Sequence, residues 1–116
     1  MTEAELQTRV LELARWHRWL AHHDRPARTR DGWRTPVQGD AGYPDLTLAG
    51  HGRLVLVELK SDRGRLDGAQ ETWRDALRRI AGIEYYVWRP KDWDVVQQVL
   101  VPGYRWDAEP AAETGG

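Results

Sequence analysis

Two carboxylates and a lysine stand at the ends of two neighbouring apolar runs. Asp45 opens the first run, and Glu58 and Lys60 close the second. The loop between the runs holds two glycines, which is typical of a hairpin. If Ala49 pairs with Leu54, Asp45 lies opposite Glu58, with Cβ atoms roughly 5 Å apart. Two carboxylates this close repel unless a cation neutralises them, and magnesium is typically held by one or two carboxylates. We therefore expect a divalent cation site.

Lys60 stands out by both position and residue type. It follows Glu58 by two residues, so both side chains leave the same face of the strand. Seventeen residues are lysine or arginine, but only two of them are lysine. Arginine would therefore be the expected residue if position 60 needed only positive charge. A lysine ammonium is compact and can give up a proton at a functional site, whereas arginine stays protonated. The residue type therefore marks Lys60 as a candidate for chemistry.

The bulk properties restrict the class of protein. A chain of 116 residues has room for one domain with a single modest core. There is no cysteine, which excludes disulfides, thiolate metal sites and cysteine nucleophiles, and which suits a reducing cytosol. The N-terminal segment is charged and lacks the apolar region of a secretion signal. No apolar run approaches the ~20 residues of a membrane span.

Positive charge is concentrated on either side of the acidic pair. The net charge of −1 excludes a generally basic nucleic-acid binder. Several arginines nevertheless precede Asp45 and two follow Lys60, whereas acidic residues gather near the C-terminus. Such a locally positive face can hold a phosphate backbone, although each arginine alone is equally explained as an ordinary surface residue. The candidate phosphate-contacting residues are Arg28, Arg30, Arg34, Arg63 and Arg65.

Hydrophobic periodicity predicts an α/β domain with elements in α-β-β-β-α-β order and a final helix. Capping boxes are expected at Thr2 with Glu5, and at Asp67 with Gln70. The domain is expected to end at residue 102, followed by a flexible tail at 103–116. The expected elements are a helix at 3–20, a polar loop at 21–43 containing a short strand at about 34–38, strands at 45–49 and 53–60, a helix at 68–81, a strand at 83–88 and a helix at 93–100.

Several short motifs occur in a fixed order: Gly42–Leu46 (GYPDL), Val57–Ser61 (VELKS), Gly64–Leu66 with Ala69-Gln70, and Trp88–Pro90 (WRP). With a glutamate-bearing helix in front, this set resembles the PD-(D/E)XK nuclease superfamily. Within that superfamily it resembles a stand-alone VRR-NUC protein of the phage and bacterial type. A bare PD and ExK pair arises often by chance, whereas the ordered set is much more specific and covers most of residues 2–100.

The resemblance implies a restriction-endonuclease-like core, a small mixed sheet flanked by helices, and a Mg2+-dependent DNA endonuclease in which Mn2+ can substitute. It implies that Asp45, Glu58, the Leu59 carbonyl and a helix glutamate hold the metal. It also implies that Lys60 either positions or deprotonates the attacking water, or stabilises the charge on phosphorus. Stand-alone members act as homodimers on four-way (Holliday) junctions, so the resemblance implies branched DNA, a homodimer, no membrane and the cytoplasm of a bacterial host.

Two other classes of function remain open. One is a catalytically inactive nuclease-fold protein that binds DNA or a replication partner, and cleavage in the presence of metal would distinguish it. The other is a structural or regulatory phage-type protein in which the acidic pair is incidental. A hairpin register that separates Asp45 from Glu58 would favour this last class.

Glu3 and Gln70 each have a competing explanation. At 100° per residue, Glu3 lies at the edge of the apolar face of the first helix and Glu5 points to solvent, so Glu3 is preferred as the helix-borne metal acid. Both glutamates also fit the ordinary preference for acids at a helix N-terminus. Gln70 matches the glutamine that follows the lysine in the family, but its capping box explains it without chemistry. The two roles of Gln70 are compatible.

The seven tryptophans have different expected roles. Trp16, Trp73 and Trp88 fall on expected helices and strands, and we expect them in the core. Trp33 lies among the arginines and is a candidate for base stacking or for an interface.

Overall fold

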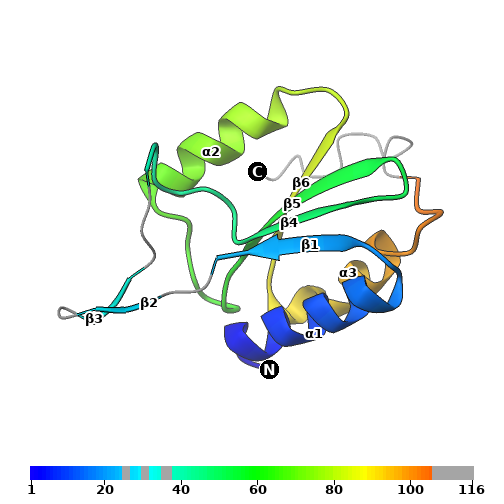
Figure 1. The fold of residues 1–116 in the computed structure, drawn as a ribbon, viewed down its shortest axis with the longest axis horizontal. Helices are drawn as coiled ribbons and strands as arrows, with labels where there is room; N and C mark the ends of the chain where they lie inside the picture. The colour runs from blue at the N-terminus through cyan, green and yellow to red at the C-terminus, as the bar shows by residue number, and fades with distance from the viewer. Residues whose placement is uncertain (25–26, 30–31, 35–37, 106–116) are drawn as a thin grey trace.

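A four-stranded mixed sheet with helices on both faces forms the body of the protein (Figure 1). The computed structural model describes residues 1–24, 27–29, 32–34 and 38–105, and for 27–29 and 32–34 it describes the backbone alone. The strand order is β1–β4–β5–β6, with β5 in the interior. Its strands are β1 (Leu20–His23), β4 (Leu46–Gly50), β5 (Arg53–Leu59) and β6 (Ile83–Trp88).

The strand directions follow from the connections. β4 pairs antiparallel with both β1 and β5, and β5 pairs parallel with β6. A parallel pair needs a crossover, and here the crossover contains helix α2 (Gly68–Arg78). Figure 1 shows α2 on one face of the sheet, with α1 (Glu3–Trp16) and α3 (Trp93–Val99) on the other. A short 3₁₀ helix, Pro90–Asp92, leads into α3. In the described part of the chain, no helix is long and apolar enough to cross a membrane.

The core lies between the sheet and the α1–α3 layer. Leu6, Val10 and Ala14 recur every four residues on α1, and all three are fully buried. β5 is covered on both faces along most of its length, which explains its almost uninterrupted apolar run. The buried cluster is completed by Trp19, Leu46, Leu48, Val55, Val57, Leu59, Trp88, Val96, Val99 and Leu100.

The β4–β5 register is the one that the sequence predicts. Ala49 pairs with Leu54, and Leu46 pairs with Val57. One further step along each strand places Asp45 beside Glu58, at the end of the ladder. Both predicted capping boxes are confirmed, at Thr2 for α1 and at Asp67 for α2.

The prediction of a first helix over 3–20 is wrong, because α1 ends at Trp16. Arg18 has φ 64°, in the left-handed region, and its N–H donates to the Arg15 carbonyl while the Trp19 N–H donates to the Ala14 carbonyl. This is a Schellman motif, which reverses the chain after a helix. The chain then returns as β1 within the segment that was expected to be a loop.

The first strand was also predicted at the wrong place. The fold has the predicted α-β-β-β-α-β order with a final helix, but the first strand of the sheet is Leu20–His23 rather than about 34–38. A separate hairpin, β2 (Ala27–Thr29) with β3 (Gly32–Arg34), occupies part of the expected loop. Residues 35–37 of the predicted strand lie outside the described residues.

The later elements are slightly shorter than expected. α2 ends at Arg78 rather than at residue 81, and α3 ends at Val99. Of the expected tail, residues 106–116 lie outside the described residues, whereas Tyr104 packs against the core cluster. Among the tryptophans, Trp88 is buried as expected, but Trp16 is 80% exposed.

Candidate metal centre

The acidic pair lies where β4 begins and β5 ends. Asp45 immediately precedes β4, and its Oδ2 accepts a 2.8 Å hydrogen bond from the Leu59 N–H. Glu58 is 2% exposed although it is a carboxylate on an interior strand. In an antiparallel ladder, the N–H and C=O of one residue point to the same neighbour. The Leu59 carbonyl therefore faces the Asp45 side, where it can complete a set of oxygen donors.

Glu58 strongly resists ionisation. Burial is the largest cause, followed by a hydrogen bond to Asp45 and repulsion from the Asp45 carboxylate, and together these raise the pKa of Glu58 to about 9. Lys60 acts in the opposite direction, and the charge of Glu3 raises the pKa further. Without a bound cation, the Asp45–Glu58 pair therefore favours holding a proton at neutral pH, and a cation beside it would favour the ionised form.

Lys60 reaches the same carboxylate from the next residue on that face. Its Nζ lies 3.9 Å from Glu58 Oε2, and its side chain is 17% exposed. The Lys60 N–H donates to the Trp88 carbonyl at 3.0 Å, which extends the pairing of β5 with β6 by one residue. The ammonium is therefore held between the buried carboxylate and solvent.

Gln70 caps α2 and contacts Glu58 through the two ends of one amide. Its Oε1 accepts from the Asp67 N–H at 3.0 Å, which closes the capping box of α2. Its Nε2 donates to Glu58 Oε2 at 3.1 Å. The N-terminus of α2 is therefore tied directly to the acidic pair.

The two glutamates in the first turn of α1 are in different situations. Glu5 Oε1 accepts from the Thr2 N–H at 2.8 Å, so its carboxylate is occupied by the helix cap. Glu3 is exposed in the first turn of α1, and its charge acts on Glu58. Glu3 therefore remains the better candidate for a water-mediated metal contact.

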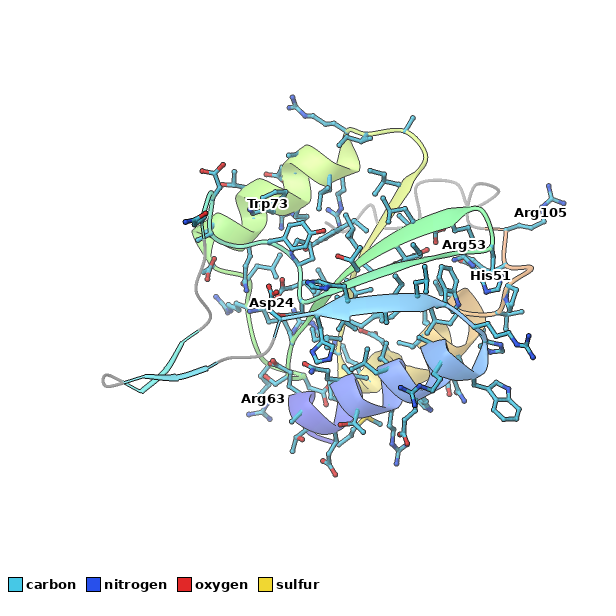
Figure 2. The ribbon with its side chains drawn as sticks, in the orientation of Figure 1. Asp24, His51, Arg53, Arg63, Trp73 and Arg105 are labelled. Carbon is cyan, nitrogen blue, oxygen red and sulfur yellow. The ribbon has the colours of Figure 1, made fainter. Side chains whose placement is uncertain are left out.

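The candidate phosphate-contacting arginines are only partly described. Arg63 and Arg65 are exposed on the loop that follows Lys60, and the Arg63 side chain is labelled in Figure 2. Arg28 and Arg34 belong to β2 and β3, whose side chains are not described. Arg30 lies outside the described residues.

The segment before Asp45 is anchored in a way that the sequence did not reveal. Gly42 has φ 96°, and a Cβ there would lie 2.5 Å from the Ala69 carbonyl carbon in the first turn of α2. The Tyr43 and Trp73 rings meet edge to face, with centroids 5.0 Å apart. The GYPDL motif indicated Gly42, but only the three-dimensional structure shows why a side chain does not fit there.

The donor set suits a hard cation that retains water. Over the residues that the structure describes, no three His, Cys, Asp or Glu side chains cluster as a metal site. Asp45, Glu58 and the Leu59 carbonyl would each offer at least one oxygen donor. Mg2+ is usually held by one or two carboxylates and keeps several waters, so this set fits Mg2+ better than it fits a metal that needs a complete protein cage.

The architecture and the acidic pair beside the lysine define a restriction-endonuclease-like α/β domain. A solved structure titled "VRR_NUC domain protein" matches with a TM-score of 0.56 and 25% identity, over 89% of this chain and 91% of that one. No family model and no curated protein matches the chain. The structural match supports assignment of this chain as a VRR-NUC domain of the nuclease class, which confirms the resemblance predicted from its motifs.

Proposed function

We propose that this protein is a Mg2+-dependent DNA endonuclease that hydrolyses phosphodiester bonds, with branched or four-way DNA as its substrate. The observation that carries the proposal is the convergence of Asp45, Glu58 and Lys60 at the end of β5. Glu58 is buried and its pKa is raised to about 9, so the site would be stabilised by an added cation. Perturbed carboxylates of this kind concentrate at functional sites.

In the proposed active state, Asp45, Glu58 and the Leu59 carbonyl hold the metal, with Glu3 contacting it through water. A bound Mg2+ or Mn2+ polarises the scissile phosphate and lowers the pKa of a bound water. Gln70 orients the Glu58 carboxylate through its 3.1 Å hydrogen bond, while its other end is fixed by the helix cap.

Lys60 has two possible actions in this scheme. Its side chain either orients the attacking water or, as a neutral amine, takes a proton from it and becomes an ammonium; alternatively, the ammonium neutralises charge that develops on the phosphate. The 3.9 Å contact with Glu58 keeps it beside the metal ligands in either case. We propose the first role, because an arginine-rich chain that needed only charge at this position would carry arginine.

The DNA backbone is proposed to contact the arginines on both sides of the site. Arg63 and Arg65 lie on the loop after Lys60, and Arg28 and Arg34 are carried by the β2–β3 hairpin, which extends away from the sheet in Figure 1. A domain of this size covers little of a four-way junction, so a two-fold homodimer is part of the proposal.

The central test is cleavage of duplex, single-stranded, flap and four-way DNA with Mg2+ or Mn2+. We expect metal-dependent cleavage by the wild type and none by Asp45→Ala or Glu58→Ala, with Glu12→Ala as an exposed-acid control. Near-wild-type turnover by either site variant would refute the metal-site assignment. DNA binding by the wild type without cleavage of any substrate would instead indicate a nuclease-fold accessory protein.

A further inference from the structure

The loop that follows Lys60 is held by the side chain of the residue that follows the C-terminal end of β6. Arg89 lies one residue beyond β6, and its Nη1 donates to the Ser61 carbonyl at 2.8 Å and to the Gly64 carbonyl at 2.5 Å. A charged donor makes stronger hydrogen bonds than a neutral one. One guanidinium nitrogen therefore bridges the first and last carbonyls of the turn that begins directly after Lys60.

Two other hydrogen bonds close this turn. The Gly64 N–H donates to the Ser61 carbonyl at 3.2 Å, and the Lys91 N–H donates to Asp62 Oδ1 at 3.0 Å. Arg89 is itself held, because its N–H donates to Asp92 Oδ2 at 2.8 Å. The segment after β6 thus supports the whole turn.

The turn passes beside the Lys60 side chain. A Cβ built at Gly64 would lie 3.6 Å from Lys60 Cδ, an ordinary van der Waals distance, and 3.0 Å from Ser61 Oγ, so Gly64 is a neighbour of the aliphatic stem with no side chain between them. A lysine side chain has up to about 2 kcal/mol of rotamer entropy to lose when it is ordered. A turn held beside the lysine stem would order part of this side chain before substrate binds.

We propose that Arg89 is a positioning residue that acts through Lys60. It bridges the Ser61 and Gly64 carbonyls, which keeps the turn against the lysine stem and the ammonium beside Glu58. The inference rests on the proposed nuclease function, because Lys60 is the group that Arg89 would position. Arg89 touches neither substrate nor metal in this scheme.

The kinetic test compares Arg89→Met with Arg79→Met, an exposed arginine at the end of α2. A misplaced catalytic group can cost about 100-fold. We expect Arg89→Met to lower kcat by about 10- to 100-fold with KM and DNA affinity in Ca2+ unchanged. Arg89→Lys, which keeps the charge, should restore part of the loss. Arg79→Met should match the wild type.

A double-mutant cycle separates positioning from general stabilisation. In a Lys60→Ala background, Arg89→Met should cause no further loss of kcat, because the residue it positions is already absent. Losses that multiply in the double variant would overturn the inference and show that Arg89 supports the fold as a whole.

Amide hydrogen exchange provides a readout that does not depend on cleavage. In metal-free protein, Arg89→Met should speed exchange at Gly64 and Lys60, while Leu59, whose N–H is held by Asp45, keeps its protection. Unchanged protection at Gly64 and Lys60 would refute the inference even if the protein is an active nuclease. An inactive wild type would refute the proposed function, and the exchange data would still decide whether Arg89 orders the turn.

Discussion

Replacing Glu58 by Gln should make the metal-free protein more stable at alkaline pH, but not near pH 5. The buried Glu58 carboxyl has a pKa of about 9 in the fold and 4.5 as an ordinary glutamate. Between these values the folded protein holds a proton that the unfolded chain has released. The free energy of unfolding must therefore fall as pH rises.

The size of the effect follows from the shift. Each pKa unit corresponds to about 1.4 kcal/mol, so Glu58 costs the fold at most about 6 kcal/mol once pH passes 9. Glutamine resembles the protonated acid, since its amide can donate to Asp45 and accept from Gln70 without titrating. The variant should thus match the wild type near pH 5 and exceed it progressively up to pH 9.

The difference in the free energy of unfolding between Glu58→Gln and the wild type can be measured by urea unfolding in EDTA from pH 5 to 9. Tryptophan fluorescence follows the unfolding. Glu12→Gln, an exposed acid on α1, serves as the matched control and should show no pH-dependent difference. A stability gap for Glu58→Gln that is constant with pH, or that closes as pH rises, would refute the reasoning.

Substitutions at three further positions test separate features of the molecule. Lys60→Arg and Lys60→Ala should both lower kcat by roughly 10²–10⁴-fold, as expected for lost acid–base catalysis. Full turnover by Lys60→Arg would show that position 60 needs only a positive charge. Gln70→Glu keeps the helix cap but places another carboxylate beside the acidic pair. Cleavage should therefore fall, while the helical circular dichroism signal is retained. Unchanged kinetics would show that the Gln70 amide has no role in cleavage. Gly42→Ala should destabilise the protein in thermal melts by more than Gly39→Ala, because both glycines have positive φ but only Gly42 meets the Ala69 backbone. Equal losses would mean that this contact relaxes freely.

The arginines that precede Asp45 in the sequence can be tested together through salt dependence. Arg28→Ala with Arg30→Ala should weaken DNA binding and reduce the slope of log K against log salt by about one unit for each lost phosphate contact. Fluorescence anisotropy at several salt concentrations measures this slope. An unchanged slope would show that the segment does not contact phosphates.

The sequence was sufficient where the determining interactions are local. The loop with two glycines and the two apolar runs predicted the register that brings Asp45 to Glu58. The capping box that fixes Gln70 is likewise a relation between residues three apart. Local pairing and capping rules act over distances that a single sequence displays.

Other features depend on contacts that a single sequence does not display. The end of α1 was missed because Arg18, rather than glycine, takes the left-handed position. β1 was missed because it is a short strand whose Leu20 is 76% exposed, so it lacks a clear apolar pattern. Arg89 appeared only as part of a motif, since its partners lie 25 and 28 residues away in the chain.

The hairpin that aligns the acidic pair also bears on how fast the chain folds. β4 and β5 are joined by a tight turn, whereas the β5–β6 pair requires the α2 crossover. Hairpins form in about 1–10 μs, and contacts between distant segments form more slowly. We therefore expect Asp45 and Glu58 to meet early in folding, before α2 brings Gln70 to them.

Charge repulsion in the acidic pair should then act on the folding transition state as well as on the final fold. Lowering the pH from 9 to 6 in EDTA should speed refolding of the wild type, because a proton on Glu58 removes the repulsion. Glu58→Gln should refold at a rate that depends little on pH over this range. Stopped-flow refolding at several pH values would measure both rates. A wild-type folding rate that is independent of pH would show that the two carboxylates meet only after the folding transition state.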